Sequence, residues 1–544
     1  MAIDSSALEL YGRPFYGIDG LDDDIQFERM ESFAGGEDDY RRSTLLDPDQ
    51  CQKLVNIIVR DNYEAWTRPG ADPMAAATGA TPLGTGAINS LTYFDTPANK
   101  FLLAAINGAL KSCQGPGQPW TATGFTTNTP GNALEMEQGI DSLLLSDGEN
   151  AMSILDQNLT LTACSNDPNV DPPVGAKILR FATGRMFAAG FAGSVAGKER
   201  DAVWVSNRLA FGSGQWNGTT RSFRVGAGDG DPVTAICPMQ GSMLAVFKAN
   251  SVWLVNADPT AEPTNFSAST VVDSVGFSVG CVGKWAATGF QNDVFFMAQD
   301  GVRTIQRMQS AVGQWQLTSP ISQPVQQYIN RINPAYWQSI AATTYKEFVL
   351  FAVPLDSSTV NNAVLVYNTR LAKWLGCWTG WTPTRFASPR FGGVVQLAFG
   401  DSIGYVNIWK DAADTSNPAT YLDNGQNIPS TIWTRSFQFG QPANTKTAYN
   451  CTLRFTAGNA AATVTAVMDL AQTASFNAAF SVSGDKLGVG RLPFQLASVK
   501  PVKVQNSLRS LPKFQELYLQ IATTSGWIKL RNVTVTAFVN ALDG

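Results

Sequence analysis

The chain has 544 residues, of which 15% are charged, and its formal net charge is -5 at neutral pH. This length allows two or three domains with sizeable cores, and the acidic balance gives no reason to expect a nucleic-acid-binding surface of the usual basic kind. Histidine is absent from the sequence, which excludes Ser-His-Asp and Cys-His catalysis and metal sites built on imidazole.

The cysteines and the N-terminal residues indicate in which cellular compartment the protein folds. Seven cysteines lie far apart, without a Cys-x-x-Cys pair, which predicts reduced and mostly buried thiols instead of a disulfide framework. The first residues lack the basic and apolar regions of a secretory signal. No apolar run approaches the ~20 residues of a membrane span. We therefore expect a protein that is made and folded in a cytoplasm and has no membrane span.

The N-terminal part, residues 1–84, is expected to form an arm followed by entry strands. Its first forty residues are acidic and lack apolar periodicity, which is typical of an arm or a surface layer and leaves an acidic ligand site as the alternative. Asp47-Pro48 predicts the start of a short helix over Asp49–Asn56. Two strands, over residues 57–60 and 65–68, are predicted to follow around a polar turn.

From about residue 90, short apolar runs alternate with turn-forming residues. Leu244–Phe247 and Val252–Val255 carry β-branched and aromatic residues on both sides of Lys248–Ser251, which predicts a β-hairpin. Similar patterns predict hairpins at Asn107-Gly108, Asp147-Gly148, Met186–Phe191 with Ala202–Ser206, Asp300-Gly301, Asn368–Arg370 and Asp401–Gly404. One hairpin buries too little surface to be stable alone, so repeated hairpins must stack. We expect four-stranded blades arranged radially, a β-propeller of six or seven blades over residues 85–412.

The chain changes character after the last hairpin. Residues 413–427 form a polar, turn-rich stretch that reads as a linker. Residues 428–544 contain several segments that alternate apolar and polar side chains, the pattern of antiparallel strands with one solvated face. The predicted fold class is all-β, with a β-sandwich appended to the C-terminal end of the propeller and an irregular acidic segment at the N-terminus.

No catalytic, cofactor-binding or metal-binding residue is predicted. The Gly226–Asp231 loop is rich in glycine and aspartate, but it precedes a strand and lacks both the Lys-Ser/Thr of a phosphate loop and the Glu of a calcium loop. A tight turn is therefore the expected role of this loop, with ion binding left open. Asp147, Asp300 and Asp401 are turn residues, where Asp is favoured for backbone reasons. The tryptophans Trp374, Trp378 and Trp381 are expected to pack in the core, with a sugar-stacking platform as the alternative.

Three stretches of sequence resemble one family of viral proteins. LVNIIVRDNYEAWTRPG is similar to the family's entry segment, in which an Asn-containing strand leads to Arg-Pro-Gly. FRVGAGDGDPVTAICPMQGSMLAVFKANSVWLV resembles its central blade, and DSVGFSVGCVGKWAATGFQNDVFFMAQDGVRTIQR its Gly-Cys strand and the hairpin that follows. The family is that of the tail nozzle (tail-tube terminal) and packaged-DNA stabilisation proteins of short-tailed bacteriophages. The resemblance covers about residues 35–410 as a pattern, and residues 428–470 more weakly.

The resemblance implies a non-enzymatic, structural virion protein of the tail, assembled in the host cytoplasm. It implies a homohexameric nozzle ring that is bound to a tail adaptor or portal-associated ring, accompanied by tail fibres or tailspikes, and without a cofactor. Such a ring would hold back the double-stranded DNA genome and conduct it during ejection, without sequence-specific contacts. Its lining is then expected to be neutral to acidic, because cationic side chains would grip phosphates. The alternative is a carbohydrate-binding or carbohydrate-cleaving propeller, as an adhesin or a glycosidase with carboxylates converging on the propeller axis.

Overall fold

A computed structural model describes residues 25–74, 81–167, 170–193, 197–218, 220–239, 241–257, 272–291, 293–307, 315–411, 417–469, 480–481, 501–509 and 511–540. The chain forms two compact units. One unit comprises Pro69–Ala413 with Asp423–Gln426, and the other comprises Met1–Arg68, Asp414–Leu422 and Asn427–Gly544. Residues 1–24, which belong to the acidic start of the chain, lie outside the described residues.

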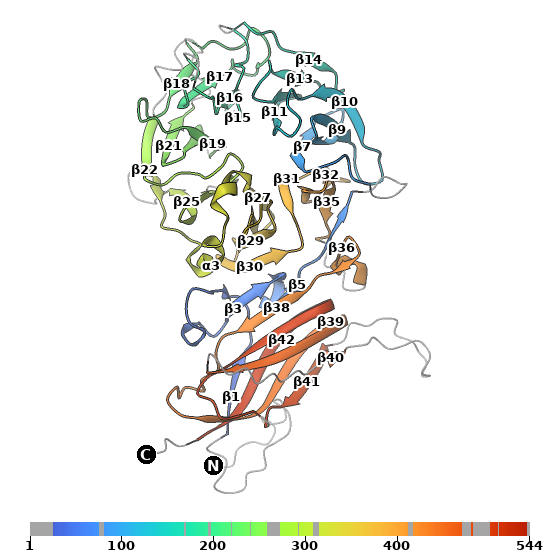
Figure 1. The fold of residues 1–544 in the computed structure, drawn as a ribbon, viewed down its shortest axis with the longest axis vertical. Helices are drawn as coiled ribbons and strands as arrows, with labels where there is room; N and C mark the ends of the chain where they lie inside the picture. Colours follow the sequence, from blue (N-terminus) through green and yellow to red (C-terminus); the bar gives the residue numbers. More distant parts are fainter. Residues whose placement is uncertain are drawn as a thin grey trace. The chain divides into compact units, whose positions relative to one another are not determined.

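The first unit is a β-propeller, in which four-stranded antiparallel sheets stand in a ring (Figure 1). Blade one consists of β7 (Ile88–Asp95), β8 (Lys100–Ile106), β9 (Ala109–Cys113) and β10 (Thr121–Thr126). Blade two consists of β11 (Glu135–Gly139), β12 (Ser142–Ser146), β13 (Ser153–Leu155) and β14 (Leu161–Ala163). Blade three consists of β15 (Ile178–Ala182), β16 (Arg185–Ala189), β17 (Ala202–Val205) and β18 (Ser222–Arg224).

The remaining blades follow in chain order, and the last one takes its outer strand from the start of the unit. Blade four consists of β19 (Val233–Pro238), β20 (Met243–Lys248), β21 (Ser251–Asn256) and β22 (Val272–Phe277), and blade five of β23 (Ala287–Phe290), β24 (Asp293–Ala298), β25 (Gly301–Arg307) and β26 (Trp315–Leu317). Blade six consists of β27 (Ala341–Tyr345), β28 (Phe348–Val353), β29 (Ala363–Asn368) and β30 (Lys373–Thr379). Blade seven consists of β31 (Pro383–Ala387), β34 (Ala398–Asp401), β35 (Val406–Trp409) and β6 (Ala71–Pro73).

The first strand of each blade lies innermost, and these strands contact one another in the closed order β7, β11, β15, β19, β23, β27, β31 and back to β7. Six blades are separate four-stranded sheets, and β27–β30 supplies a further four-stranded blade between β23 and β31. The ring is closed by the antiparallel pairing of β6 with β35. The predicted propeller of six or seven blades is thus confirmed, and seven inner strands surround its axis.

The closing strand corrects the predicted domain boundary. Residues 71–73 were assigned to the N-terminal arm within 1–84, but they pair with β35 and belong to the propeller unit, which begins at Pro69. A three-residue strand carries too little periodicity to be recognised by itself. The predicted linker, 413–427, divides between the two units. Its residue Asp423 belongs to the propeller unit and accepts a hydrogen bond from the indole Nε1 of Trp381 at 2.9 Å.

The predicted hairpins are present, and the turn at Asn107-Gly108 adopts the expected backbone conformation. Asn107 and Gly108 have φ of 46° and 83°, the left-handed pair that a two-residue turn requires. The core lies between the blades: side chains of blades one and two pack together, as do those of blades three and four. The last and first blades share a cluster that includes Val406 and Leu102. Burial of each such side chain contributes about 1.5–3 kcal/mol.

Helices are few and short among the described residues. They comprise α3 (Gln326–Ile329) and 3-10 turns over Ser43–Leu45, Asp61–Tyr63, Gln323–Val325, Pro334–Ser339 and Pro418–Tyr421. Two-stranded ribbons are formed by β32 (Arg390–Phe391) with β33 (Val394–Val395), and by β36 (Leu422–Asp423) with β37 (Gln426–Asn427). No helix in the described ranges is long and apolar enough to cross a membrane.

The second unit is built on two strands of 23 residues each, β39 (Lys446–Met468) and β42 (Leu517–Val539), which pair along their whole length. The other strands of this unit are β1 (Ile25–Met30), β2 (Gly36–Glu37), β3 (Gln50–Val55), β4 (Ile57–Val59), β5 (Ala65–Thr67), β38 (Ser430–Thr434), β40 (Phe480–Ser481) and β41 (Pro501–Ser507). Residues 428–544 were expected as a sandwich of antiparallel strands. The strands are antiparallel, and β38, β42, β39 and β40 are neighbours in one hydrogen-bonded sheet.

The short helix predicted over Asp49–Asn56 is wrong. Residues 50–55 form β3, which pairs with β38 in an antiparallel register. Leu54 and Cys51 are buried in this strand, so tertiary pairing overrides the local start signal of Asp47-Pro48. The two strands predicted after it are confirmed as β4 and β5, and they pair with each other.

Candidate functional site: a charged cavity within the ring of inner strands

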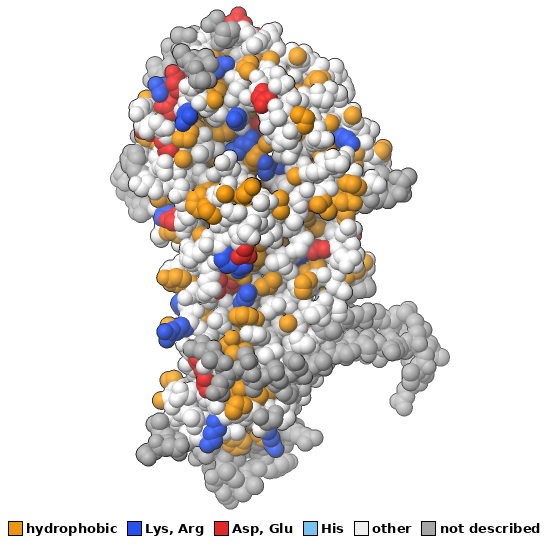
Figure 2. Space-filling view, viewed as in Figure 1, with side chains coloured by type: hydrophobic (Ala, Val, Ile, Leu, Met, Phe, Trp, Pro, Cys, Tyr) orange, Lys and Arg blue, Asp and Glu red, His pale blue; other side chains and the backbone are white. Residues whose placement is uncertain are grey.

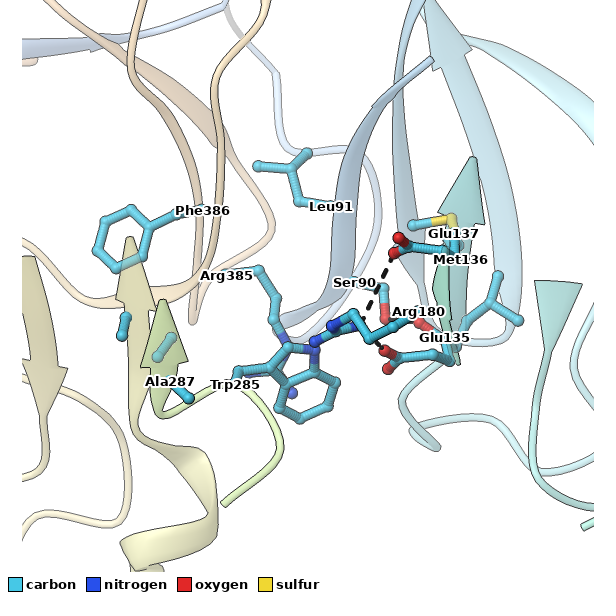
Figure 3. Close-up of a pocket in the computed structure, with 13 residues that line it drawn as sticks. Ser90, Leu91, Glu135, Met136, Glu137, Arg180, Trp285, Ala287, Arg385 and Phe386 are labelled. Atoms are coloured by element: carbon cyan, nitrogen blue, oxygen red, sulfur yellow. Dashed lines mark hydrogen bonds and ion pairs between the residues drawn. The ribbon is translucent and has the colours of Figure 1, made fainter. Parts of the chain in front are cut away.

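A cavity of about 210 Å³ lies within the ring of inner strands of the propeller. Its lining comes from blades around the ring: Ser90 and Leu91 of β7, Glu135, Met136 and Glu137 of β11 with Leu134 before it, Arg180 of β15, Ala287 of β23 with Trp285 before it, Ala341 and Ala342 of β27, and Arg385 and Phe386 of β31. Figure 3 shows the charged side chains converging on this space. On the face drawn in Figure 2, basic side chains gather towards the middle of the propeller.

Two carboxylates reach the cavity from a single strand. Glu135 and Glu137 are two residues apart in β11, and residues at this spacing share one face of a strand. Met136, between them, packs into the core shared by blades one and two. The alternation along β11 therefore turns both glutamates towards Arg180 of blade three and turns Met136 towards blade one.

Glu135 is paired with cations from two other blades. Arg180 Nη1 lies 2.6 Å from one carboxylate oxygen, and Lys284 Nζ lies 2.9 Å from the other. The glutamate side chain is only 3% exposed. Burial raises the pKa of Glu135, but Lys284 and Arg180 outweigh burial and hold this pKa below its usual value. Glu135 is therefore a permanently ionised carboxylate held between two cations.

Glu137 has a different environment on the same strand. Its Oε1 accepts a hydrogen bond from the Phe181 backbone N–H at 2.9 Å, while Arg180 Nη1 lies 3.8 Å from its Oε2. The side chain keeps 24% of its surface accessible, but that surface belongs to the lining of the cavity. Burial raises the pKa of Glu137 to about 7, against the opposing effect of Arg180. Glu137 thus titrates near neutral pH.

The cations of the cavity are themselves enclosed. Lys284 Nζ donates to the Lys177 carbonyl at 3.0 Å and lies 3.9 Å from the centre of the Trp285 ring. Arg385 stacks on Trp285, with its Cζ 3.1 Å from the ring centre, so this indole lies against two cations. Burial lowers the pKa of Lys284 to about 8 and the pKa of Arg385 to about 9.

The arrangement is suited to recognition of a charged group, because one of its two carboxylates, Glu135, is ion-paired at both oxygens. A glycosidase needs one carboxylic acid and one free carboxylate, both facing the substrate. Only Glu137 offers an adjustable proton here, because both oxygens of Glu135 are held by Arg180 and Lys284. No group of three potential metal ligands of the Cys, Asp or Glu type is found in the described part of the chain.

The carboxylates at the predicted turns have local roles. Asp147 accepts hydrogen bonds from the backbone N–H groups of Glu149 and Asn150 at 2.9 and 2.8 Å, and Asp401 accepts from Ile403 and Tyr405 at 3.0 and 2.8 Å. The side chain of Asp300 pairs with Arg303, three residues away. These acids stand at hairpin tips and do not line the cavity.

The Gly226–Asp231 loop is a turn that is fastened to the neighbouring hairpin. Asp229 pairs with Lys248, whose side chain is fully buried and whose Nζ also donates to the Val225 carbonyl at 3.0 Å. Asp231 accepts from the Asn250 backbone N–H at 2.9 Å. Both carboxylates are thus engaged within blade four and the loop before it.

The tryptophan run packs in the core. Trp374, Trp378 and Trp381 are 2%, 0% and 3% exposed. The indole Nε1 of Trp374 donates to the Ile321 carbonyl at 2.7 Å. These side chains therefore form no platform on the surface, and the packing interpretation is confirmed. All seven cysteines are also buried and unpaired, as predicted.

Sequence reasoning missed the charged cavity. Its members lie far apart along the chain, and none belongs to a motif of fixed spacing. A usable signal exists in the strand pattern, because Glu135, Glu137, Arg180 and Arg385 all stand in the first strand of a blade. Charged residues in the first strand of several blades indicate a polar site within the ring, because these strands lie innermost.

Comparisons with known proteins give little to set beside this geometry. No family model matches the chain, and no curated protein matches it. Among solved structures, the computationally designed Ika8 protein has 10% sequence identity and a TM-score of 0.36, with 60% of this chain and 96% of the designed chain covered. The propeller assignment rests on the strand pairing described above.

Proposed function

We propose that the chain is a structural protein of a bacteriophage tail, which forms a nozzle ring that retains the DNA genome and then conducts it during ejection. The proposal starts from the resemblance of the entry segment and of two blade segments to the nozzle family. In this proposal six copies form the ring, which binds an adaptor or portal-associated ring and carries tail fibres or tailspikes. The protein then resides in the virion tail after assembly in the host cytoplasm.

The observation that best supports this proposal is how the interior of the propeller is filled. The cavity there is about 210 Å³, the volume of roughly seven water molecules, and it is crossed by the ion pairs of Glu135. A DNA duplex, whose major groove alone is about 12 Å wide, cannot pass through it. A conduit for DNA must therefore be formed between copies of the chain.

The second unit offers a surface suited to such a conduit. Across β38, β42 and β39, Thr431, Ala522 and Thr463 stand in one register row, with Trp433, Gln520 and Thr465 in the next. Lys53 of β3 continues the second row beyond Trp433. The uncharged, half-exposed side chains of these two rows, here named the uncharged strip, alternate with buried apolar residues. An uncharged surface releases no counterions from DNA and so resists sliding little.

The mass of the purified chain in solution tests the proposal. A ring predicts a particle of about six times the mass of one chain, and a stable monomer over the micromolar range would contradict it. Duplex DNA should associate weakly with the ring and with little salt dependence. Thr465→Lys, which adds a cation to the uncharged strip, should strengthen that association and steepen its salt dependence if the strip lines the conduit. Lys513, which is exposed in the same unit, offers a control as Lys513→Gln.

A carbohydrate-binding or carbohydrate-cleaving protein is the second candidate, and the charged cavity is the observation that favours it. It predicts a monomer that binds glycans, with turnover that Glu137→Gln abolishes. The nozzle proposal predicts no hydrolase or transferase activity in a screen of glycan and peptide substrates. Turnover that is lost with Glu137→Gln would contradict the structural role.

A further inference from the structure

The charged cavity carries a surplus of positive charge. The titratable groups that face one another there are the cations Arg180, Lys284 and Arg385 and the carboxylates Glu135 and Glu137. Arg180 and Lys284 are paired with Glu135. With Glu137 ionised the surplus is one positive charge, and with Glu137 protonated it is two.

Arg385 is the cation without an acidic partner. Among the residues that the structure describes, no carboxylate forms an ion pair with it, and its Nε is buried without a hydrogen-bond partner. Its Nη1 donates only to the backbone carbonyl of Thr384, the preceding residue. A buried guanidinium nitrogen without a hydrogen-bond partner is costly, because desolvation removes its hydration without replacing it.

The position of this guanidinium is fixed by packing. Its Cζ lies 3.1 Å from the centre of the Trp285 ring, and both residues line the cavity (Figure 3). Stacking on an indole leaves the edge of the guanidinium plane, which carries its donors, free to meet a planar or tetrahedral oxyanion. The ammonium of Lys284 lies 3.9 Å from the centre of the same ring.

We propose that this cavity binds a small oxyanion, a carboxylate or phosphate group, with Arg385 as its principal contact. A volume of about 210 Å³ admits such a group with a few attached atoms or waters. The oxyanion would supply the negative charge that Arg385 lacks. This site is independent of the proposed conduit, because it lies inside one propeller.

Glu137 makes binding depend on pH. Its carboxylate lies in the same lining, so it repels an oxyanion when ionised and ceases to do so when protonated. Glu135 does not contribute to this change, because it stays ionised between Arg180 and Lys284. Binding should therefore strengthen as the pH falls through neutrality.

Isothermal titration of the full chain with inorganic phosphate and with acetate, at pH 6 and pH 8, tests the proposal. At least one of the two should bind at pH 6 and bind more weakly at pH 8, and the pair distinguishes the two sources of the oxyanion. Arg385→Gln should weaken binding about tenfold or more, the loss expected for a charge-assisted pair. Arg331→Gln, which removes an exposed arginine paired with Asp356, should leave binding unchanged.

Glu137→Gln provides the second variant. It removes the competing charge while keeping a hydrogen-bond acceptor, and should bind more tightly than the parent at pH 8. Part of the pH dependence should remain in this variant, because the pKa of Lys284 is about 8 and this cation also loses charge between pH 6 and pH 8. Absence of binding by the parent to both probes at both pH values would overturn the proposal. So would parental affinity in Arg385→Gln, or, if that variant does not fold, an unchanged pH dependence in Glu137→Gln.

Discussion

Carboxylates at the hairpin tips and carboxylates in the interior of the propeller ring differ in where their partners lie along the chain. At the tips, Asp147 and Asp401 accept hydrogen bonds from backbone N–H groups within four residues of themselves. Within the ring, Glu135 receives Arg180 from the next blade, 45 residues away in sequence, and Lys284 from the segment before β23. A tip can be satisfied by its own turn, whereas the enclosed charges exist only once the ring has closed.

The comparison also separates two energetic regimes. An exposed ion pair gains little, because water screens it and its side chains lose freedom. A buried pair is strongly destabilised when one partner is lost, because the remaining charge is left without solvent. Substitutions of the charges within the ring should therefore have larger effects than substitutions in exposed ion pairs such as Arg331–Asp356.

The largest effect is expected for Glu135→Gln. This change leaves the guanidinium of Arg180 and the ammonium of Lys284 enclosed without the carboxylate that pairs with them at 2.6 and 2.9 Å. The free energy of unfolding of the propeller should fall by about 3–5 kcal/mol, measured by denaturant titration. A loss below about 1 kcal/mol would show that the pairs are solvated and that the comparison fails.

Glu137→Gln should raise the free energy of unfolding, and should do so only above acidic pH. The pKa of Glu137 is raised to about 7 in the folded protein, so its contribution to stability is fully present below about 4.3, the unfolded pKa, and is lost as the pH rises towards 7. The variant escapes this loss, and should be more stable than the parent by up to about 3 kcal/mol at pH 8. Thermal unfolding at pH 4 and pH 8 measures the difference, and equal stabilisation at both pH values would contradict the assignment.

Gly301→Val tests a tip where the backbone, not charge, sets the cost. Gly301 has φ of 138°, and a Cβ there would lie 2.2 Å from Ser322 Oγ. We expect a loss of about 1–3 kcal/mol in the free energy of unfolding. Gly241→Val separates the two causes, because Gly241 also has positive φ, 76°, but has open space around its Cβ position and so carries the backbone cost without the contact. If Gly301→Val melts like the parent, the hairpin turn does not depend on this glycine.

The smallest effect is expected for Asp356→Asn. Asp356 pairs with Arg331 at 2.9 Å, but both side chains are about half exposed, at 59% and 47%. Solvent screening leaves such a pair with little net contribution, so the midpoint of denaturant unfolding should not change measurably. A loss comparable to that of Glu135→Gln would remove the distinction between the surface and the interior of the ring.

The same contrast explains what could be predicted from the sequence. The turn at Asn107-Gly108 is encoded by two adjacent residues that tolerate positive φ, so its hairpin was predictable. The helix expected over Asp49–Asn56 failed because pairing of β3 with β38, more than 370 residues later, decides its conformation. Glu135 and Arg180 meet only because neighbouring blades place their first strands side by side. No local pattern records that contact.

The central claim is that several copies of this chain form a ring around a path for DNA. Electron microscopy of the purified particles tests it most directly. The account predicts a ring of six copies, with a central opening wide enough for a duplex and separate from the axis of each propeller. Particles that consist of single chains, or a ring without such an opening, would contradict it.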